Sequence, residues 1–367
     1  MAGMVLTALG LMSGTSCDGV DAAIISTDGE TIVSVGPSYY RPYSDYERDK
    51  IKRSLKTARF WPAHTSIPED IATVERMITA IHAEAVKTLI EKSNLAGKVD
   101  IIGFHGHTVL HRPDQRRTIQ IGNAVALAKA SGIDVVYDFR SADVAAGGHG
   151  APLAALYHAA RAGEVKERPL LVVNIGGVSN ATWIAGSDVM AFDTGPGNAP
   201  VDDWMQAQFG RPHDENGETA SRGRIDEARI NAALDHPFFK NKPPKSLDRN
   251  DFTLKLADGL SPEDGAATLI AFTAAAIAEG VRVCPSPPAR ILITGGGRHN
   301  AALMRELKRR ANVPVDPVEA VGWNGDMVEA EAFAFLAVRH LRGLPLSLPS
   351  TTGVPKPMTG GKLAKAH

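Results

Sequence analysis

The sequence has little cysteine and almost no net charge. Only Cys17 and Cys284 occur among 367 residues, so a framework of disulfide bonds is not indicated. Lysine and arginine number 40 against 41 aspartates and glutamates. This balance gives no support for a nucleic-acid partner or for an acidic membrane partner.

Long apolar runs and an early basic residue are also missing. The first basic residue is Arg41, so the N-terminal region lacks the charged part of a signal peptide. No apolar run reaches the length of a membrane span. The Ala-rich segment near residue 270 comes closest, and Glu263, Asp264 and Glu279 bracket it. We therefore expect a cytoplasmic protein without a membrane partner.

The apolar content is that of a globular protein with more than one core. Hydrophobic residues make up 44% and charged residues 22% of the chain, which are ordinary values. A chain of 367 residues exceeds one average domain, so two domains are expected.

The most informative stretch runs from residue 9 to residue 27. Two apolar, strand-like segments flank a turn whose glycine, hydroxyl and acidic residues are Gly14, Thr15, Ser16, Asp18, Gly19 and Asp21. The glycines allow positive φ and close approach of a ligand. Backbone N–H groups and the two hydroxyls can point at an anion, and the carboxylates suit a hydrated Mg²⁺. The pattern predicts a Mg-nucleotide phosphate loop on a β-hairpin; a plain hairpin turn is the alternative.

The following segments alternate between strands and helices. Residues 31–39 suit a third antiparallel strand, residues 41–68 are polar and are expected to be irregular, and Pro68 opens a long helix. Strands are expected at 99–104, which runs into a polar turn at His105, and at 133–137. This alternation predicts parallel strands joined by βαβ crossovers.

The second half repeats the opening design. Strands at 170–174, 181–185 and 189–192 surround a second Gly-rich turn at 175–180. A third Gly-rich turn, 294–297, follows a short strand and precedes a helix. We expect two similar α/β domains with a ligand in the cleft between them.

This three-part layout resembles the actin/sugar-kinase/Hsp70-type ATPase fold. More specifically, the chain resembles the anhydro-N-acetylmuramic acid kinases from residue 10 to residue 330. The motifs that carry the resemblance, in order, are Met12-Ser13-Gly14-Thr15-Ser16, Asp18-Gly19-Val20-Asp21, Phe104-His105-Gly106, Asp138-Phe139-Arg140, Ala145-Ala146-Gly147-Gly148, Gly150-Ala151-Pro152-Leu153, Asn174-Ile175-Gly176-Gly177, Phe192-Asp193-Thr194-Gly195-Pro196-Gly197-Asn198 and Gly295-Gly296-Gly297.

The resemblance implies an α/β fold with two actin-like (ribonuclease H-like) domains and a nucleotide cleft between them. We expect an N-terminal domain at 1–140 and a second domain at 141–325. A C-terminal helix at 326–345 is expected to pack back at the cleft, and residues 346–367 to form a flexible tail. The resemblance also suggests a homodimer.

The resemblance implies a particular reaction as well. Such kinases use ATP and Mg²⁺ to open the 1,6-anhydro ring of anhydro-N-acetylmuramic acid with water and to phosphorylate its O6, giving MurNAc-6-phosphate for peptidoglycan recycling. Water must attack the anomeric carbon while O6 departs toward the γ-phosphate, so a carboxylate must accept the proton of the water.

We assign that base to Asp193, which follows a strand, lies close to Gly195 and Gly197 and falls on a family motif; a cap of the following turn or helix is the alternative. The residues expected to bind the nucleotide are Gly14, Thr15, Ser16, Cys17, Asp18, Gly19, Val20, Asp21, Asn174, Gly176, Gly177, Gly295, Gly296 and Gly297. Which aspartate contacts Mg²⁺ stays open.

The residues expected to contact the sugar are His105, Asp138, Arg140 and Glu329. Arg140 is the candidate for the lactyl carboxylate, through a bidentate contact. The alternatives are a buried, satisfied histidine at 105, a structural ion pair at Asp138 or Arg140, and a solvated helix-start acid at Glu329.

His107 and His149 stand where the family commonly has glutamine, and histidine adds pH dependence near neutrality. Two other functions stay open on sequence alone. One is another N-acetylhexosamine kinase of the same fold; the other is a non-catalytic ATP switch of the actin/Hsp70 type.

Overall fold

The computed structural model describes residues 3–14, 16–63, 65–247 and 251–367. The chain forms two compact units. One combines Met1–Arg161 with Met327–His367, and the other is Ala162–Asp326. The second unit is therefore an insertion in the first.

The first unit is a mixed sheet with helices. Its elements are β1 (Leu6–Ser13), β2 (Gly19–Thr27), β3 (Ile32–Pro42), α1 (Asp45–Ala58), α2 (Glu69–Ser93), β4 (Ile101–Arg112), β5 (Arg117–Ile121), α3 (Ala124–Ser131), β6 (Val135–Tyr137), α4 (Ser141–Ala145), α5 (Ala155–Arg161), α11 (Val328–Leu341), α12 (Pro349–Thr352) and β12 (Lys362–Ala364). The strand order is β12-β6-β4-β1-β2-β3, with β5 paired to β4. Strands β1, β2 and β3 form an antiparallel meander, and β4 and β6 continue the sheet in parallel with β1.

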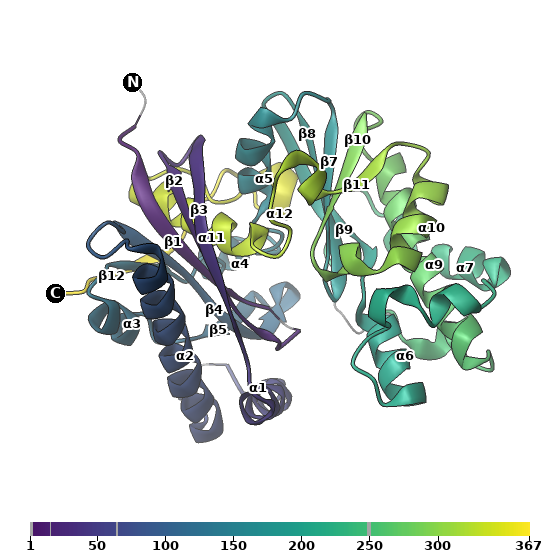
Figure 1. Ribbon diagram of the computed structural model, residues 1–367, viewed down its shortest axis with the longest axis horizontal. Helices are drawn as coiled ribbons and strands as arrows, with labels where there is room; N and C mark the ends of the chain where they lie inside the picture. The colour runs from purple at the N-terminus through teal and green to yellow at the C-terminus, as the bar shows by residue number, and fades with distance from the viewer. Residues whose placement is uncertain (1–2, 15, 64, 248–250) are drawn as a thin grey trace. The chain divides into compact units, whose positions relative to one another are not determined.

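Helix α11 lies directly on the centre of this sheet, although it comes from the C-terminal part of the chain (Figure 1). Two glycines on neighbouring strands make the close approach possible. A Cβ at Gly10 would lie 1.8 Å from the carbonyl oxygen of Ala330, and one at Gly103 would lie 2.0 Å from that of Phe333. Any side chain at these positions would push the helix off the strands.

The second unit repeats the same sheet order. Its elements are β7 (Leu170–Ile175), β8 (Val178–Ala185), β9 (Asp188–Pro196), α6 (Ala199–Phe209), α7 (Glu227–Leu234), α8 (Pro237–Lys240), α9 (Pro262–Arg282), β10 (Arg290–Thr294), α10 (Ala301–Ala311) and β11 (Val315–Pro317). The order is β11-β10-β7-β8-β9, again an antiparallel meander extended by two parallel strands. The prediction of an α/β fold built from two similar domains is confirmed.

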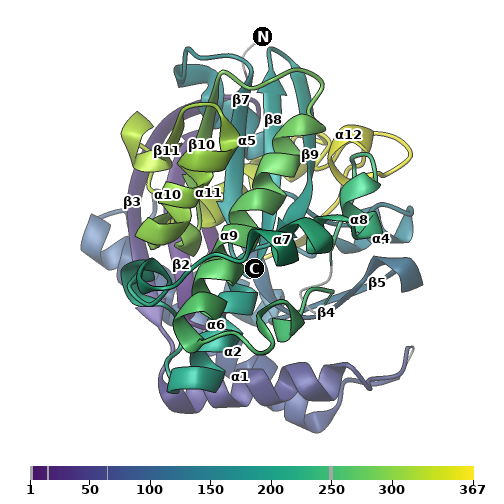
Figure 2. The ribbon, with the colours of Figure 1, turned by 90° about the vertical axis from the view of Figure 1, so that its right-hand side faces the viewer.

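Helix α9 is the core helix of the second unit. Among the described residues it is the helix whose length and mean hydropathy match a membrane span, and 78% of its most apolar window is buried. It packs against β9 and α10, and Figure 2 shows it crossing the face of the sheet.

Two local predictions were wrong. Residues 41–68 were expected to be irregular, but they contain α1, which begins with a capping box formed by Ser44 and Glu47. A polar turn was expected at His105, but β4 continues to Arg112 because β5 returns beside it as an antiparallel partner.

The prediction of a flexible tail at 346–367 was also wrong. Strand β12 pairs with β6 through Lys362–Ala364, and Thr352 donates a hydrogen bond of 2.6 Å to the buried Asp143. The first unit continues to Arg161 rather than ending at residue 140, because α5 packs on α11. Tyr157 donates a hydrogen bond to Glu331 there and its ring contacts Phe335.

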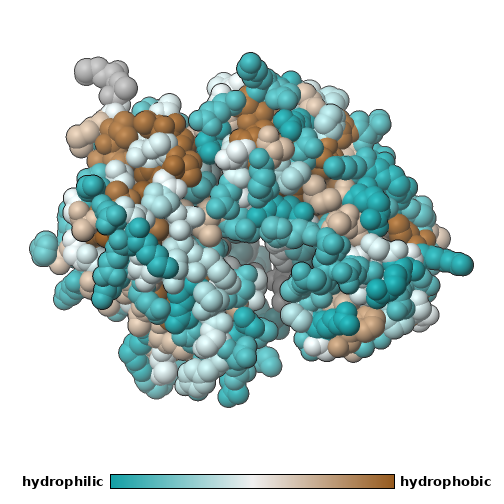
Figure 3. Space-filling view, in the orientation of Figure 1, coloured by the Kyte–Doolittle hydropathy of each residue, from teal (hydrophilic) through white to brown (hydrophobic). Residues whose placement is uncertain are grey.

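The surface of the first unit carries an apolar patch near the start of β1 and β3, which Figure 3 shows in brown. The exposed large apolar side chains of these segments are those of Met4, Val5, Val33 and Val35.

Candidate active site

The turn between β1 and β2 has a defined geometry. The N–H of Cys17 donates to the carbonyl of Gly14 at 3.1 Å, and Cys17 adopts a φ of 56°. The hydroxyl of Ser16 donates to the carboxylate of Asp18 at 2.8 Å. Thr15, also expected to bind the nucleotide, lies outside the described residues. The rest of the predicted phosphate loop thus forms a tight, hydrogen-bonded turn.

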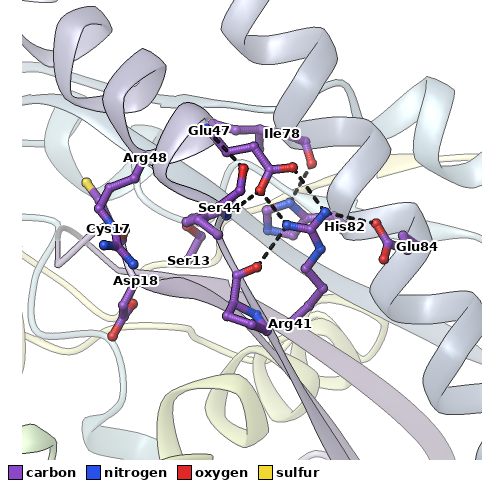
Figure 4. Close-up of polar contacts among 12 residues, drawn as sticks. Ser13, Cys17, Asp18, Arg41, Ser44, Glu47, Arg48, Ile78, His82 and Glu84 are labelled. Carbon is purple, nitrogen blue, oxygen red and sulfur yellow. Dashed lines mark hydrogen bonds and ion pairs between the residues drawn. The ribbon is translucent and has the colours of Figure 1, made fainter.

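Donors from β3, from α1 and from the segment between them bind the carbonyls of Cys17 and Asp18 in this turn. Arg48 donates through Nε to the carbonyl of Cys17 at 3.1 Å, and Figure 4 shows its guanidinium beside Cys17 and Asp18. The carbonyl of Asp18 accepts from the N–H of Tyr43 at 2.8 Å and from the hydroxyl of Tyr40 at 2.9 Å. These contacts fix the turn and place a positive charge next to it, which favours an anionic ligand.

Arg48 is held in place by the start of its own helix. Glu47 accepts from the N–H of Ser44 at 2.8 Å and from Arg41 at 2.5 and 3.0 Å, as Figure 4 shows. Because Arg48 is the next residue of α1, this network fixes the backbone that carries its side chain.

Buried groups hold the inner side of the turn. The hydroxyl of Ser13 lies 2.8 Å from the hydroxyl of Tyr43 and 2.9 Å from Nδ1 of His107, and Nε2 of His107 lies 3.9 Å from Sγ of Cys17. Burial lowers the pKa of His107 to about 4. His107 therefore stays neutral, and the expectation that it adds pH dependence near neutrality was wrong.

In the second unit the two predicted Gly-rich turns lie together at one end of the sheet. Strands β7 and β10 run in parallel, with Thr294 paired to Asn174. Gly295 has a φ of 77°, and a Cβ there would lie 2.3 Å from Oδ1 of Asn174. A Cβ at Gly297 would lie 2.5 Å from the side chain of Ile175. Glycine is required where these turns meet.

The loop after β9 joins the same cluster. The N–H of Asn198 donates to the carbonyl of Gly176 at 2.7 Å, and the N–H of Gly197 donates to that of Gly177 at 3.0 Å. Three motifs that are far apart in the sequence are therefore in contact.

Asp193 lies on β9 and is 7% exposed. Its carboxylate accepts from the N–H of Leu247 at 2.8 Å. Burial raises the pKa of this carboxyl to about 7, while the bond from Leu247 and the charge of Lys245 act in the opposite direction. Helix α6 begins after Asn198, so the carboxylate of Asp193 does not serve as its N-cap. A carboxyl with this pKa is suited to accept a proton near neutral pH.

Lys245 is the charged neighbour of Asp193. Its carbonyl accepts from the N–H of Asp193 at 2.9 Å. Its ammonium donates to the carbonyl of Phe238 at 2.9 Å and lies 4.3 Å from the centre of that ring. Burial lowers the pKa of Lys245, and Asp193 raises it.

In the first unit, His105 and Arg140 are in direct contact. Nδ1 of His105 lies 2.9 Å from the carbonyl of Gly106, and since a carbonyl only accepts, Nδ1 carries the proton. Nε2 then accepts from Nε of Arg140 at 3.0 Å. Burial, together with the charge of Arg140, holds the pKa of His105 well below its ordinary value. Both ring nitrogens are engaged, which favours the alternative of a buried, satisfied histidine that orients Arg140.

Arg140 and Glu329 are electrostatic neighbours. Burial lowers the pKa of Arg140 to about 10, and the charge of Glu329 raises it. Burial raises the pKa of Glu329, with Arg140 lowering it and Asp18 raising it. Glu329 is half-buried rather than a solvated helix-start acid. Glu329 is thus an electrostatic neighbour of both Arg140 and Asp18.

Asp138 has a φ of 55° and forms an ion pair of 2.8 Å with Lys362 of β12. It also borders a cavity of about 290 Å³. The polar residues that line this cavity are Glu75, His105, Thr118, Gln120, Asp138 and Ser141. Asp138 therefore forms the structural ion pair that was the alternative, and it also lies at a cavity. Within the described part of the chain, no three His, Cys, Asp or Glu side chains cluster closely enough to hold a metal ion.

Comparison with known proteins gives the family. The model of the anhydro-N-acetylmuramic acid kinase family matches residues 6–366. The chain belongs to this family. Relatives with the same name come from Rhodopseudomonas palustris strain HaA2, 53% identical over 99% of this chain and 100% of the relative, and from Acidiphilium cryptum strain JF-5, 52% identical over 98% of each.

Matches to solved structures are distant. The activator of the 2-hydroxyisocaproyl-CoA dehydratase from Clostridium difficile with bound ADPNP is 11% identical, covers 92% of this chain and 96% of its own, and has a TM-score of 0.43. A glucokinase from Streptomyces griseus in complex with glucose and AMPPNP is 12% identical, covers 90% and 99%, and has a TM-score of 0.41.

The sequence of this anhydro-N-acetylmuramic acid kinase family member did not point to two residues that contact the candidate site. They are Arg48 and Lys245. The position of Arg48 in the first turn of a helix could have been predicted, because the capping box of Ser44 and Glu47 marks the start of that helix. Lys245 carries no signal beyond lying in a basic, Pro-containing connection, since its contact with Asp193 joins residues far apart in the chain.

Proposed function

We propose that this protein is an ATP-dependent kinase that opens the 1,6-anhydro ring of anhydro-N-acetylmuramic acid with water and phosphorylates O6, giving MurNAc-6-phosphate. The observation that carries the proposal is the buried carboxyl of Asp193, whose pKa is raised to about 7. Ordinary sugar kinases transfer the phosphoryl group to a hydroxyl that is already present. A ring-opening kinase must also activate water, and a base with this pKa is suited to do so.

In the proposed reaction, the water oxygen bonds to the anomeric carbon as the bond between that carbon and O6 breaks. The proton of the water passes to the Asp193 carboxylate, and O6 bonds to the γ-phosphorus of ATP, which releases ADP. No separate acid is required, because the phosphoryl group captures the leaving oxygen. Such a transfer depends on positioning and charge neutralisation.

The nucleotide is proposed to use two sets of groups. In the first unit the nucleotide is proposed to bind to the turn from Gly14 to Asp21, next to which Arg48 lies. In the second unit it takes the cluster of Gly-rich turns around Asn174, Gly176, Gly177 and 295–297. Mg²⁺ in kinases is held by one or two carboxylates together with phosphate oxygens. Asp18 and Asp21 fit that role, and the ion would neutralise phosphate charge when bound.

The sugar is proposed to present its lactyl carboxylate to Arg140. Nε and one Nη1 hydrogen of Arg140 are engaged by His105 and Gly150. The remaining N–H groups can form charge-assisted bonds with a carboxylate. Glu329, coupled to Arg140, is proposed to contact the sugar, and His105 and Asp138 to shape its site.

We further propose that the protein works in the cytoplasm, where ATP is available, in peptidoglycan recycling, and that it forms a homodimer. The dimer rests on the family resemblance, and sedimentation of the purified protein tests it.

A product assay in ¹⁸O-water tests the function. Purified protein is mixed with Mg-ATP and 1,6-anhydro-MurNAc, with Asp193→Asn beside it. We expect MurNAc-6-phosphate that carries ¹⁸O at C1. In the variant the rate should fall by about 10²–10⁴-fold, the usual contribution of a general base.

Two other results would replace the proposal. Phosphorylation of MurNAc or GlcNAc without ring opening would make the protein an ordinary N-acetylhexosamine kinase. Binding of ATP with no sugar product would favour the non-catalytic switch.

A further inference from the structure

The buried carboxylate of Asp143, to which no part of the proposed reaction is assigned, joins the C-terminal segment to the loop beside Arg140. Asp143 on α4 is 2% exposed. Its Oδ2 atom accepts from the hydroxyl of Thr352 at 2.6 Å and from the hydroxyl of Ser347. Its Oδ1 atom accepts from the N–H of Gly150 at 2.6 Å. Both carboxylate oxygens are therefore engaged, one with each segment.

The loop at 148–150 is wrapped closely around this carboxylate. The N–H of Gly148 donates to the carbonyl of Asp143 at 2.9 Å, and a Cβ at Gly148 would lie 2.2 Å from Oδ1 of Asp143. The N–H of His149 donates to the carbonyl of Thr352 at 2.7 Å. The C-terminal segment thus reaches the loop directly at His149 and through Asp143 at Gly150.

Gly150 connects Asp143 to Arg140 through its two backbone polar groups. Its N–H is held by Asp143, and its carbonyl accepts from Nη1 of Arg140 at 2.6 Å. Nε of Arg140 is held by His105. The orientation of the guanidinium therefore depends on two anchors, and one of them is fixed by residues from the end of the chain.

We propose that Asp143, held by Ser347 and Thr352, is a positioning residue that sets the orientation of Arg140 toward the carboxylate of the sugar. The inference rests on the proposed function, because it takes Arg140 as the group that binds the lactyl carboxylate. A bidentate contact requires both N–H groups of the fork to be aligned, so a loop that shifts at Gly150 weakens sugar binding and leaves ATP binding intact.

The test is the double variant Ser347→Ala with Thr352→Val, which removes both hydroxyl donors and keeps the packing volume of the threonine. We expect the KM for anhydro-MurNAc to rise by about tenfold, the scale of one charge-assisted hydrogen bond, and the KM for ATP to stay within about twofold. Thr351→Val is the matched control. Thr351 is equally buried, but its hydroxyl bonds only to Leu348 among the described residues, so it should behave like the wild type.

A cycle with Arg140→Lys separates positioning from general destabilisation. In that background the Ser347/Thr352 changes should raise the KM for the sugar by less than about twofold, because the aligned fork is already lost. An equal effect in both backgrounds, or an unchanged KM in the double variant, overturns the proposal. If the double variant fails to fold, Thr352→Val alone is compared with Thr352→Ser, which keeps the hydroxyl and should restore the KM.

Failure of the proposed function is seen separately, in the wild-type product assay. If the wild type phosphorylates another sugar, the same cycle is run with that sugar. A sugar without a carboxylate as the true substrate overturns the positioning role.

Discussion

The ammonium of Lys245 lowers the pKa of Asp193 while donating its own hydrogen bond to the carbonyl of Phe238. The backbones of the two residues are hydrogen-bonded, but the attraction between their side chains is an influence of charge. A change at Lys245 can alter the ionisation of Asp193 while the Asp193 side chain keeps its bond from Leu247.

Lys245→Met should move the pH dependence of turnover upward. Loss of the positive charge raises the pKa of Asp193 above about 7, and a general base works only when ionised. A rise of about one unit would reduce the ionised fraction at pH 7 from about a half to about a tenth. Measured from pH 5.5 to 9.5, the rising limb of kcat should shift to higher pH. Lys240→Met, which removes an exposed lysine of the preceding helix, should leave it in place; a limb that does not move for Lys245→Met contradicts the prediction.

Asp193→Asn should also change the pH dependence of stability. The folded-state pKa of about 7 lies above the ordinary value of 3.8, so ionisation of this carboxyl favours the unfolded chain. Wild-type stability should therefore fall as pH rises from about 4 to about 7 and then level off. Asparagine cannot ionise, and the variant should gain up to about 4 kcal/mol over the wild type across that range.

Urea unfolding at several pH values measures that gain. Asp188→Asn, an exposed change on the same strand, is the control and should show no such trend. A gain that is constant with pH would mean that ionisation of Asp193 is not its cause.

Arg48→Met should weaken the nucleotide and spare the sugar. The change removes the bond to the carbonyl of Cys17 and a positive charge beside the turn. A bond of this kind is worth roughly 1–2 kcal/mol, so the KM for ATP should rise about five- to thirtyfold, while the KM for anhydro-MurNAc changes little. Arg53→Met is the matched control, because Arg53 lies on the same helix and pairs with Asp49 at the surface. Equal effects of the two variants would rule out the role of Arg48.

Gly103→Ala should destabilise the first unit. The added Cβ would lie 2.0 Å from the carbonyl of Phe333, and forced overpacking of this kind typically costs about 1–3 kcal/mol. Gly163→Ala, where a Cβ meets nothing within 4 Å, should change the free energy of unfolding by less than about 0.5 kcal/mol. Urea unfolding followed by circular dichroism compares them, and equal midpoints would show that α11 can retreat from the sheet without loss.

The repeated sheet was predictable because its signals are local. In each half, apolar runs alternate with a Gly-rich turn, and that order survives although the side chains differ. Helix α1 was missed because Ile51, Ser54 and Ala58 are its buried residues, too few for a clear apolar period, although the capping box was present.

The buried polar contacts were not predictable. His105 and His107 read as a polar turn, yet they lie inside β4 because Arg140 and Ser13 satisfy them. Similarly, the glycine and proline near the C-terminus indicate a loose tail. The segment is ordered because Thr352 donates a hydrogen bond to Asp143, which the sequence does not reveal. The residues in each of these hydrogen bonds are far apart in the sequence, so no local sequence pattern predicts the bonds.

The insertion of the second unit into the first also fixes the order in which the protein becomes complete during synthesis. A nascent chain that has reached Asp326 contains the whole second unit, whereas the strands of the first unit still lack α11 over Gly10 and Gly103. The N-terminal part of the first unit is thus synthesised first, but its fold can be completed only after the C-terminal segment has been synthesised. A chain that ended at Asp326 would contain every residue of the second unit, while the sheet of the first unit would expose to solvent the face that α11 covers.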